Sequence, residues 1–185
     1  MSAARDLMQA AGSVLGVSRH ALGLENAQDL VLIRPIRPDD RALELAFLRA
    51  LSTETLYQRL MSSRKLLPGE LERLTNIDLR NEAALVATVG IGRDERQIGV
   101  VRLIRDGTGR HCEFAIVIAD EWQGRGLGRR LIEALVAEAR QAGYRTMWGL
   151  AFAHNARMLA LGRKLGFEVR PQPGDATLRR LVRSL

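Results

Sequence analysis

The spacing of apolar residues changes several times between residues 31 and 185, and each change predicts a switch between strand and helix. Alternating or continuous apolar runs predict strands that begin near Val31 and Glu113 and strands over residues 83–90, 97–105, 144–151, 167–170 and 177–182. Helical spacing predicts helices after Pro38, from Ser52 to Leu60, from Pro68, from the glycines near 126 to Gly143, and from Asn155 to Leu165.

The order of these elements predicts an α/β (α+β) fold. Three consecutive strands in the middle of the chain favour antiparallel pairing, whereas the later helical crossovers favour parallel pairing. We therefore expect a mixed, mostly antiparallel sheet flanked by helices on both faces. Residues 31–185 suit one domain, and residues 1–30 form a helical arm or a partly ordered segment.

The stretch from Glu113 to Leu135 organises the chain. It begins as an apolar strand, passes through Gly124, Gly126 and Gly128, and continues with leucines at helical spacing. Glycines at a helix start leave backbone N–H groups uncovered where the helix dipole favours an anion, so the turn predicts a phosphate cradle. It lacks the Gly-Lys-Ser/Thr ending of a Walker A loop and the Gly-x-Gly-x-x-Gly spacing of a dinucleotide loop.

Charge and cysteine content narrow the classes of partner. The net charge is +7, but the cations are scattered and aromatic residues make up only 4% of the chain, which argues against nucleic-acid binding. Cys112 is the only cysteine, so no intrachain disulfide or multi-cysteine metal site is expected. No apolar run approaches the ~20 residues of a membrane span. We expect a cytoplasmic protein without a metal.

Two motifs carry a family resemblance over residues 31–170. Gln123, Gly126 and Gly128 form a Gln-x-x-Gly-x-Gly pattern, and Asn155 precedes a Leu-Gly-Phe sequence at 165–167; together they resemble the GNAT superfamily of N-acetyltransferases. The chain looks most similar to the acetyltransferase domain of bacterial protein lysine acetyltransferases. That resemblance rests on residues 33–35, 51–52, 84–87 and 113–115, and on Tyr57, Arg59 and Asp78.

The resemblance implies transfer of an acetyl group from acetyl-CoA to a primary amine, with Glu113 as general base. The acceptor implied is a protein lysine, possibly on an acyl-CoA synthetase, and mixed charges over residues 40–80 suit a protein surface. A small-molecule amine acetyltransferase and a non-catalytic acetyl-CoA-binding module are the alternatives. The residues implied for coenzyme binding are Ile116, Val117, Ile118, Gln123, Gly124, Arg125, Gly126, Leu127, Gly128, Arg129 and Asn155.

Three positions leave alternatives open. Glu113 could be an exposed ion-pair partner at the strand start, because structural ion pairs often mimic functional carboxylates. Asn155 could be a helix cap, a coenzyme ligand or both. Gly162 stands where many relatives place a tyrosine that protonates the departing thiolate, so water or the thiolate's own low basicity would have to suffice.

Overall fold

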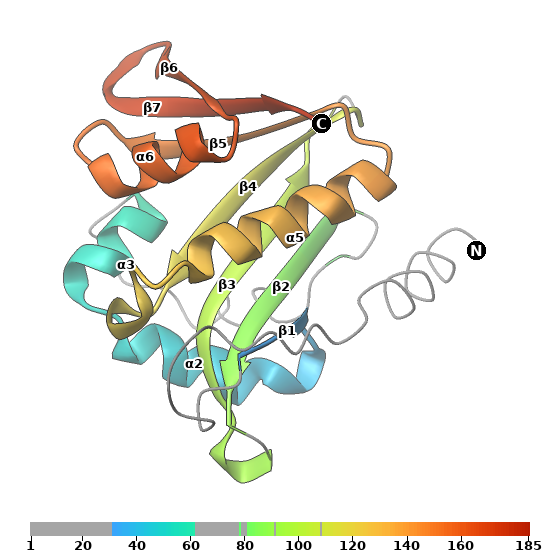
Figure 1. Ribbon diagram of the computed structural model, residues 1–185, viewed down its shortest axis with the longest axis vertical. Helices are drawn as coiled ribbons and strands as arrows, with labels where there is room; N and C mark the ends of the chain where they lie inside the picture. The colour runs from blue at the N-terminus through green and yellow to red at the C-terminus, as the bar shows by residue number, and fades with distance from the viewer. Residues whose placement is uncertain (1–30, 62–77, 79–80, 91, 108) are drawn as a thin grey trace.

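The computed structural model describes residues 31–61, 78, 81–90, 92–107 and 109–185 (Figure 1). The expected arm over residues 1–30 and the expected helix at Pro68 lie outside the described residues. The described part of the chain contains one sheet in the order β1-β2-β3-β4-β5-β7-β6. Its strands are β1 (Leu32–Pro35), β2 (Glu82–Val89), β3 (Arg96–Arg105), β4 (His111–Ile118), β5 (Thr146–Phe152), β6 (Glu168–Gln172) and β7 (Asp175–Ser184).

Only the β4–β5 pair is parallel, and all other neighbouring strands of this sheet run antiparallel. The mixed, mostly antiparallel sheet expected from the sequence is therefore confirmed. The last strand is longer than the predicted 177–182, because Gly174, at a φ of 82°, closes a tight hairpin and β7 pairs with strands on both sides.

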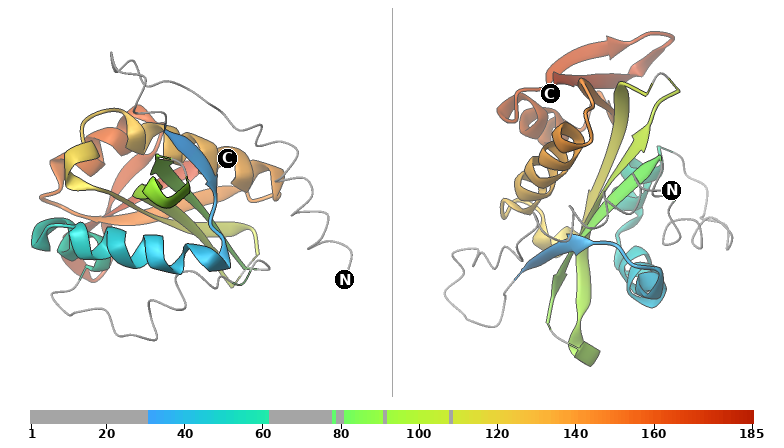
Figure 2. Two further views of the ribbon diagram at one scale, coloured as in Figure 1. Left: turned by 90° about the horizontal axis from the view of Figure 1, so that it is seen from below. Right: turned by 90° about the vertical axis from the view of Figure 1, so that its right-hand side faces the viewer.

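Helices cover both faces of the sheet, as predicted (Figures 1 and 2). One face carries α5 (Leu127–Gln141) and α6 (Ala156–Lys164), and the opposite face carries α2 (Arg41–Ala50) and α3 (Thr53–Leu60). The short 3-10 turns are η1 (Pro38–Asp40), η2 (Gly92–Asp94) and η3 (Asp120–Trp122). Ser52 caps α3 as predicted, since its Oγ accepts a hydrogen bond from the Thr55 N–H at 3.2 Å.

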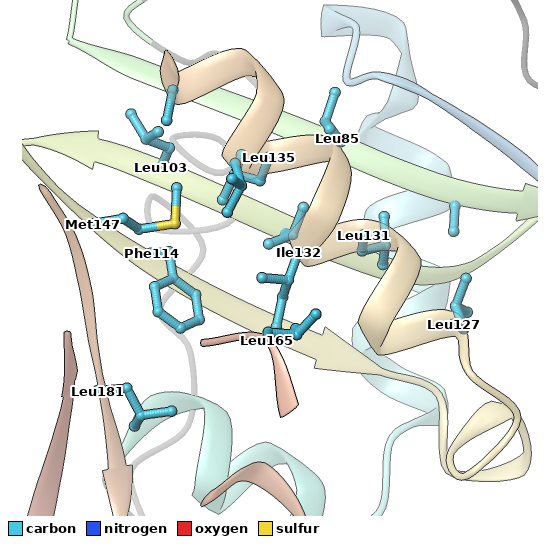
Figure 3. Close-up of a cluster of buried hydrophobic side chains, with 14 of the residues drawn as sticks. Leu85, Leu103, Phe114, Leu127, Leu131, Ile132, Leu135, Met147, Leu165 and Leu181 are labelled. Atoms are coloured by element: carbon cyan, nitrogen blue, oxygen red, sulfur yellow. The ribbon is translucent and has the colours of Figure 1, made fainter. Parts of the chain in front are cut away.

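The main core lies between α5 and the sheet (Figure 3). Leu127, Leu131, Ile132 and Leu135 are fully buried on one side of α5. Burying a side chain of this size contributes roughly 1.5–3 kcal/mol, so this face of the helix fixes its position on the sheet. The start of α5, where the glycine turn ends, is thereby fixed as well.

Strand β4 divides its side chains between two cores. Cys112 and Phe114 enter the cluster under α5, whereas Val117 enters a second cluster with Phe47 and Leu48 of α2. This alternation is the one that the pleat of a strand requires. Glu113, which is one residue from Cys112 and Phe114, therefore faces the α2–α3 side of the sheet.

Strands β4 and β5 separate after a short parallel contact. Their pairing ends with Glu113 opposite Trp148, although β4 stays paired with β3 as far as Ile118. At the separation point a Cβ on Gly149 would lie 2.7 Å from the Phe114 ring and 2.8 Å from the Phe114 carbonyl oxygen. Glycine is therefore required here, because only its bare backbone leaves room for Phe114 as the strands diverge.

Candidate active site

A cavity of about 750 Å³ lies where β4 and β5 diverge. It is lined by the second half of α3, β4 from Glu113 to Ile118, the loop around Gly124 and Gly126, the start of α5, part of β5, and α6. A cavity of this size is in the range of small-molecule and cofactor sites. Within it the structure brings together residues that are more than 90 positions apart in the sequence, such as Gln58 and Asn155.

The glycine turn meets the requirements of a phosphate cradle. Gly124 and Gly126 have φ values of 76° and 83°, and a Cβ built on either would have no atom within 4 Å. The glycines are therefore needed for the left-handed backbone, and the space above them is open. Gly126 precedes α5, and no side chain caps the first turn of that helix in the described structure. The first N–H groups of α5 are thus available to a pyrophosphate.

The other four residues predicted at this turn lie differently relative to the cavity. Gly128 and Arg129 line it, whereas Leu127 and Arg125 are not among its lining residues. Leu127 is fully buried, so only its backbone is available, and a Cβ on Gly128 would lie 3.2 Å from Leu161 of α6. Arg129 lines the cavity and pairs with Glu133 at 2.8 Å. Arg125 lies over the Trp122 ring, 5.3 Å from its centroid.

The backbone of β4 has an open edge towards the cavity. The Ala119 N–H donates to the Ile98 carbonyl of β3 at 2.9 Å. Hydrogen-bonding direction alternates along an antiparallel strand, so Ile118 and Ile116 direct their backbone groups away from β3 and Val117 directs its groups towards it. All three line the cavity. The backbone groups of Ile116 and the Ile118 N–H suit the amide groups of a pantetheine arm, whereas the Ile118 carbonyl accepts a hydrogen bond from Gln123.

Gln123 and Asn155 both hold the cavity walls together. The Gln123 Nε2 donates to the Ile118 carbonyl at 3.2 Å and to Thr55 Oγ1 at 3.1 Å. The Asn155 Oδ1 accepts from the Met158 N–H at 3.0 Å, which makes it the N-cap of α6, and its Nδ2 donates to Gln58 Oε1 at 2.9 Å. The cap role of Asn155 is therefore confirmed, and its role as a coenzyme ligand stays a prediction.

Asp120 anchors α3 beside the glycine turn. Its carboxylate accepts hydrogen bonds from the Ser52 N–H at 2.9 Å, from Ser52 Oγ at 2.6 Å and from Thr55 Oγ1 at 2.6 Å. Partial desolvation raises the pKa of Asp120, but these hydrogen bonds outweigh it and hold the pKa below its usual value. The start of α3 is thus fixed to the residues that lead into the glycine turn.

Glu113 lies half-buried at the cavity wall, on the face of the sheet that carries α3. Burial raises the pKa of its carboxyl group, while the charges of Arg180 and Arg59 act in the opposite direction. Within the described part of the chain no cation forms an ion pair with it. The structure therefore does not contain the exposed ion pair considered as an alternative, and it leaves the carboxylate facing the cavity.

The surroundings of Gly162 disfavour a tyrosine at that position. A Cβ at residue 162 would overlap Cδ2 of Leu181, which is fully buried on β7. Helix α6 therefore packs against Leu181 at this glycine, and any larger side chain would require the buried Leu181 side chain to shift. The position faces the core in this chain.

Comparison with known proteins identifies the family. Residues 48–167 match the model of the Acetyltransferase (GNAT) family. The chain belongs to the GNAT family of acetyltransferases. Members of this family take the acetyl group from acetyl-CoA, and the open edge of β4 and the uncapped start of α5 are the features of this GNAT chain that fit the coenzyme.

Named relatives support the same assignment for this GNAT chain. Acetyltransferase PA5475 of Pseudomonas aeruginosa is 36% identical over 148 residues, which are 80% of this chain and 80% of that protein. Acetyltransferase Pat of Mycolicibacterium smegmatis is 32% identical over 136 residues, 72% of this chain but only 40% of Pat. The GNAT domain of S. lividans PAT superposes with a TM-score of 0.76 at 26% identity, covering 84% of this chain and 90% of that domain.

Several cavity residues were not singled out from the sequence. Gln58 has no motif of its own, and Arg157 and Lys164 are ordinary positions of an exposed helix face until the fold places them at the cavity. In the described ranges no His, Cys, Asp and Glu side chains cluster as a metal site would require, and no helix is long and apolar enough to cross a membrane.

Proposed function

We propose that this GNAT enzyme acetylates the side-chain amine of a protein lysine and that Glu113 is its general base. The observation that carries the proposal is the position of Glu113: a half-buried carboxylate at the cavity wall, at the point where β4 leaves β5 and its backbone edge opens. Its raised pKa suits a group that must accept a proton near neutral pH.

The residues divide the reaction into binding and proton transfer. The N–H groups at the start of α5 would hold the pyrophosphate, and the backbone of Ile116 and Ile118 would hold the pantetheine arm of acetyl-CoA, which supplies the thioester. The acceptor enters from the α3 side, and Glu113 removes a proton from its ammonium. The free amine then attacks the thioester carbon and the C–S bond breaks. Coenzyme A leaves as a thiolate, and the nitrogen releases its second proton to solvent as the amide forms.

Thiolate departure requires no acid from α6 in this proposal. A thiol has a pKa of roughly 8.5, so its anion leaves readily and takes up a proton from water afterwards. The packing of Gly162 on Leu181 supports this step, since that contact removes the space in which a tyrosine would stand.

The protein acceptor is supported by two of the named similarities. Acetyltransferase Pat of M. smegmatis and the GNAT domain of S. lividans PAT are similar to this chain over 72% and 84% of its length, and the sequence motifs resemble the protein lysine acetyltransferases. We extend the proposal to an acyl-CoA synthetase as one target and to a cytoplasmic location.

An acceptor survey tests the proposal directly. Purified enzyme is incubated with labelled acetyl-CoA and either a protein lysate or a panel of small amines that includes spermidine, an aminoglycoside and amino acids. We expect label on protein lysines, and none with Glu113→Gln at matched concentration. Rapid labelling of a small amine without protein labelling would replace the lysine acceptor with a small-molecule one. Coenzyme binding without transfer to any acceptor would indicate a binding module.

A further inference from the structure

The sheet face that carries Glu113 continues beyond the cavity onto β5 and β7. Glu113 lies opposite Trp148 of β5, and Leu150 lies opposite Arg180 of β7. Residues that are direct partners in a sheet project from the same face, and residues two apart on one strand do so as well. Trp148, Leu150 and Arg180 therefore share the face of Glu113, and Leu150 also lines the cavity.

Arg180 is held in place by an aromatic ring and has no acidic partner in the described structure. Its Cζ lies 3.9 Å from the centroid of the Trp148 ring, a stacked cation–π arrangement. Stacking fixes the plane of a guanidinium but leaves the N–H groups at its edge able to bind a carboxylate. On the neighbouring strand β6, Arg170 is neutralised by Glu168 at 2.5 Å, so Glu168 is already occupied.

The charges of the described side chains around Glu113 do not balance. Arg59 lines the cavity on the α3 side, and its positive charge also acts on Glu113. Arg102 is paired with the buried Glu44 at 3.0 Å, so the charges of these two side chains cancel. Three described guanidiniums, those of Arg59, Arg102 and Arg180, thus lie near two described carboxylates, those of Glu44 and Glu113. Among these described groups, one positive charge is left over beside the proposed base.

An uncompensated cation next to a site for an amine has a clear consequence for the acceptor. It repels an incoming ammonium and attracts a carboxylate that arrives with it. We propose that Arg180, held on Trp148, binds a carboxylate of the acceptor, supplied by an acidic residue next to the target lysine. This inference rests on the proposed lysine acetyltransferase activity and adds the chemistry of the acceptor to it.

Matched peptides test the proposal. Three peptides carry one acceptor lysine and differ at the adjacent residue, which is glutamate, glutamine or arginine. For the wild type we expect kcat/KM to fall by about tenfold from the glutamate to the glutamine peptide, and further for the arginine peptide, because a charged partner contributes chiefly to specificity. Arg180→Gln should remove the preference, and Arg180→Glu should reverse it while leaving the affinity for acetyl-CoA unchanged.

Arg183→Gln is the matched control. Arg183 is also an arginine of β7 that lies over an aromatic ring, with its Cζ 5.9 Å from the Phe167 centroid, but it projects from the opposite face. This variant should keep the wild-type preference. Equal kcat/KM for the three peptides with the wild type, or an unchanged preference in Arg180→Glu, would overturn the proposal.

A different outcome would bear on the proposed lysine acetyltransferase activity and not on carboxylate binding by Arg180. If no protein or peptide is acetylated but a small amine is, the lysine acceptor is wrong. Carboxylate binding by Arg180 is then tested with an amino acid and its decarboxylated amine. A preference for the amino acid that disappears in Arg180→Gln supports the Arg180 proposal, and equal rates for the two amines overturn it.

Discussion

The two sides of the cavity are built in different ways. The coenzyme side, from Gln123 to Gly128, is one continuous stretch that works mainly through its backbone. The acceptor side draws Glu113, Arg59 and Arg180 from β4, α3 and β7 and works through their charges. The coenzyme side should therefore be disrupted by changes of backbone conformation, and the acceptor side by changes of charge.

The largest effect is expected from a neutral replacement on the acceptor side. Glu113→Gln should lower turnover by roughly 10²- to 10⁴-fold, the usual contribution of a general base, and leave coenzyme affinity unchanged. The wild-type rate should fall as pH decreases through the raised pKa of Glu113, and the variant should lack that dependence. Steady-state kinetics across pH measures both, with Asp94→Asn on the exposed turn η2, which does not line the cavity, as the control.

Thermal stability distinguishes a catalytic role of Glu113 from a structural one. A carboxyl group whose pKa is raised by folding destabilises the folded state above its unfolded-state pKa, so Glu113→Gln should hold or raise the melting temperature at neutral pH. A wild-type rate combined with a lower melting temperature would make Glu113 a structural residue.

On the coenzyme side, the largest effect is expected from a change of backbone conformation. Gly126→Asp adds a side chain at a φ of 83° and a negative charge beside the phosphates, and we expect affinity for coenzyme A to fall by about 100-fold, or ~2.7 kcal/mol. Gly174→Asp is the matched control, because Gly174 has a φ of 82° and equally open surroundings in the β6–β7 hairpin. Calorimetry should show normal affinity for the control, and equal losses in the two variants would contradict the cradle.

Packing of α6 should give a smaller effect. Gly162→Ala places a Cβ against Leu181, and overpacking of this kind costs roughly 1–3 kcal/mol. Thermal denaturation should show a lower melting temperature for the single variant and a smaller difference when the change is made in a Leu181→Ala background. Equal losses in both backgrounds would exclude the contact as the reason for glycine.

The smallest effect is expected from Asp120, whose hydrogen bonds join α3 to the residues that lead into the glycine turn. Its pKa is lowered in the folded state, so the carboxylate stabilises the fold above the reference value of 3.8, and that stabilisation is lost as pH falls through the folded pKa. Because the group is mostly exposed, we expect Asp120→Asn to cost on the order of 0.5 kcal/mol. Melting temperatures of the two proteins should differ at neutral pH and converge in acid; a constant difference would contradict the role of its charge.

Local patterns predicted most of the elements because their causes are local. The cap at Ser52, the leucines of α5 and the positive-φ glycines act through neighbouring residues, so their positions can be read from short windows. The two faces of β4 followed from the pleat alone. Val117 illustrates the limit: the sequence placed it in the coenzyme site, but its backbone direction depends on how β4 pairs with β3.

The sequence by itself determined the strand, the glycine turn and the helix that form the phosphate cradle, since conformational freedom and periodicity are properties of a contiguous stretch. Through the family resemblance, the sequence also indicated Glu113 as the candidate general base. Only the tertiary structure decided what surrounds that carboxylate, because Arg59 and Arg180 come from α3 and β7, and Trp148 lies beside Glu113 only through sheet pairing. Electrostatic effects depend on distances through space and on burial, and neither is encoded in sequence spacing.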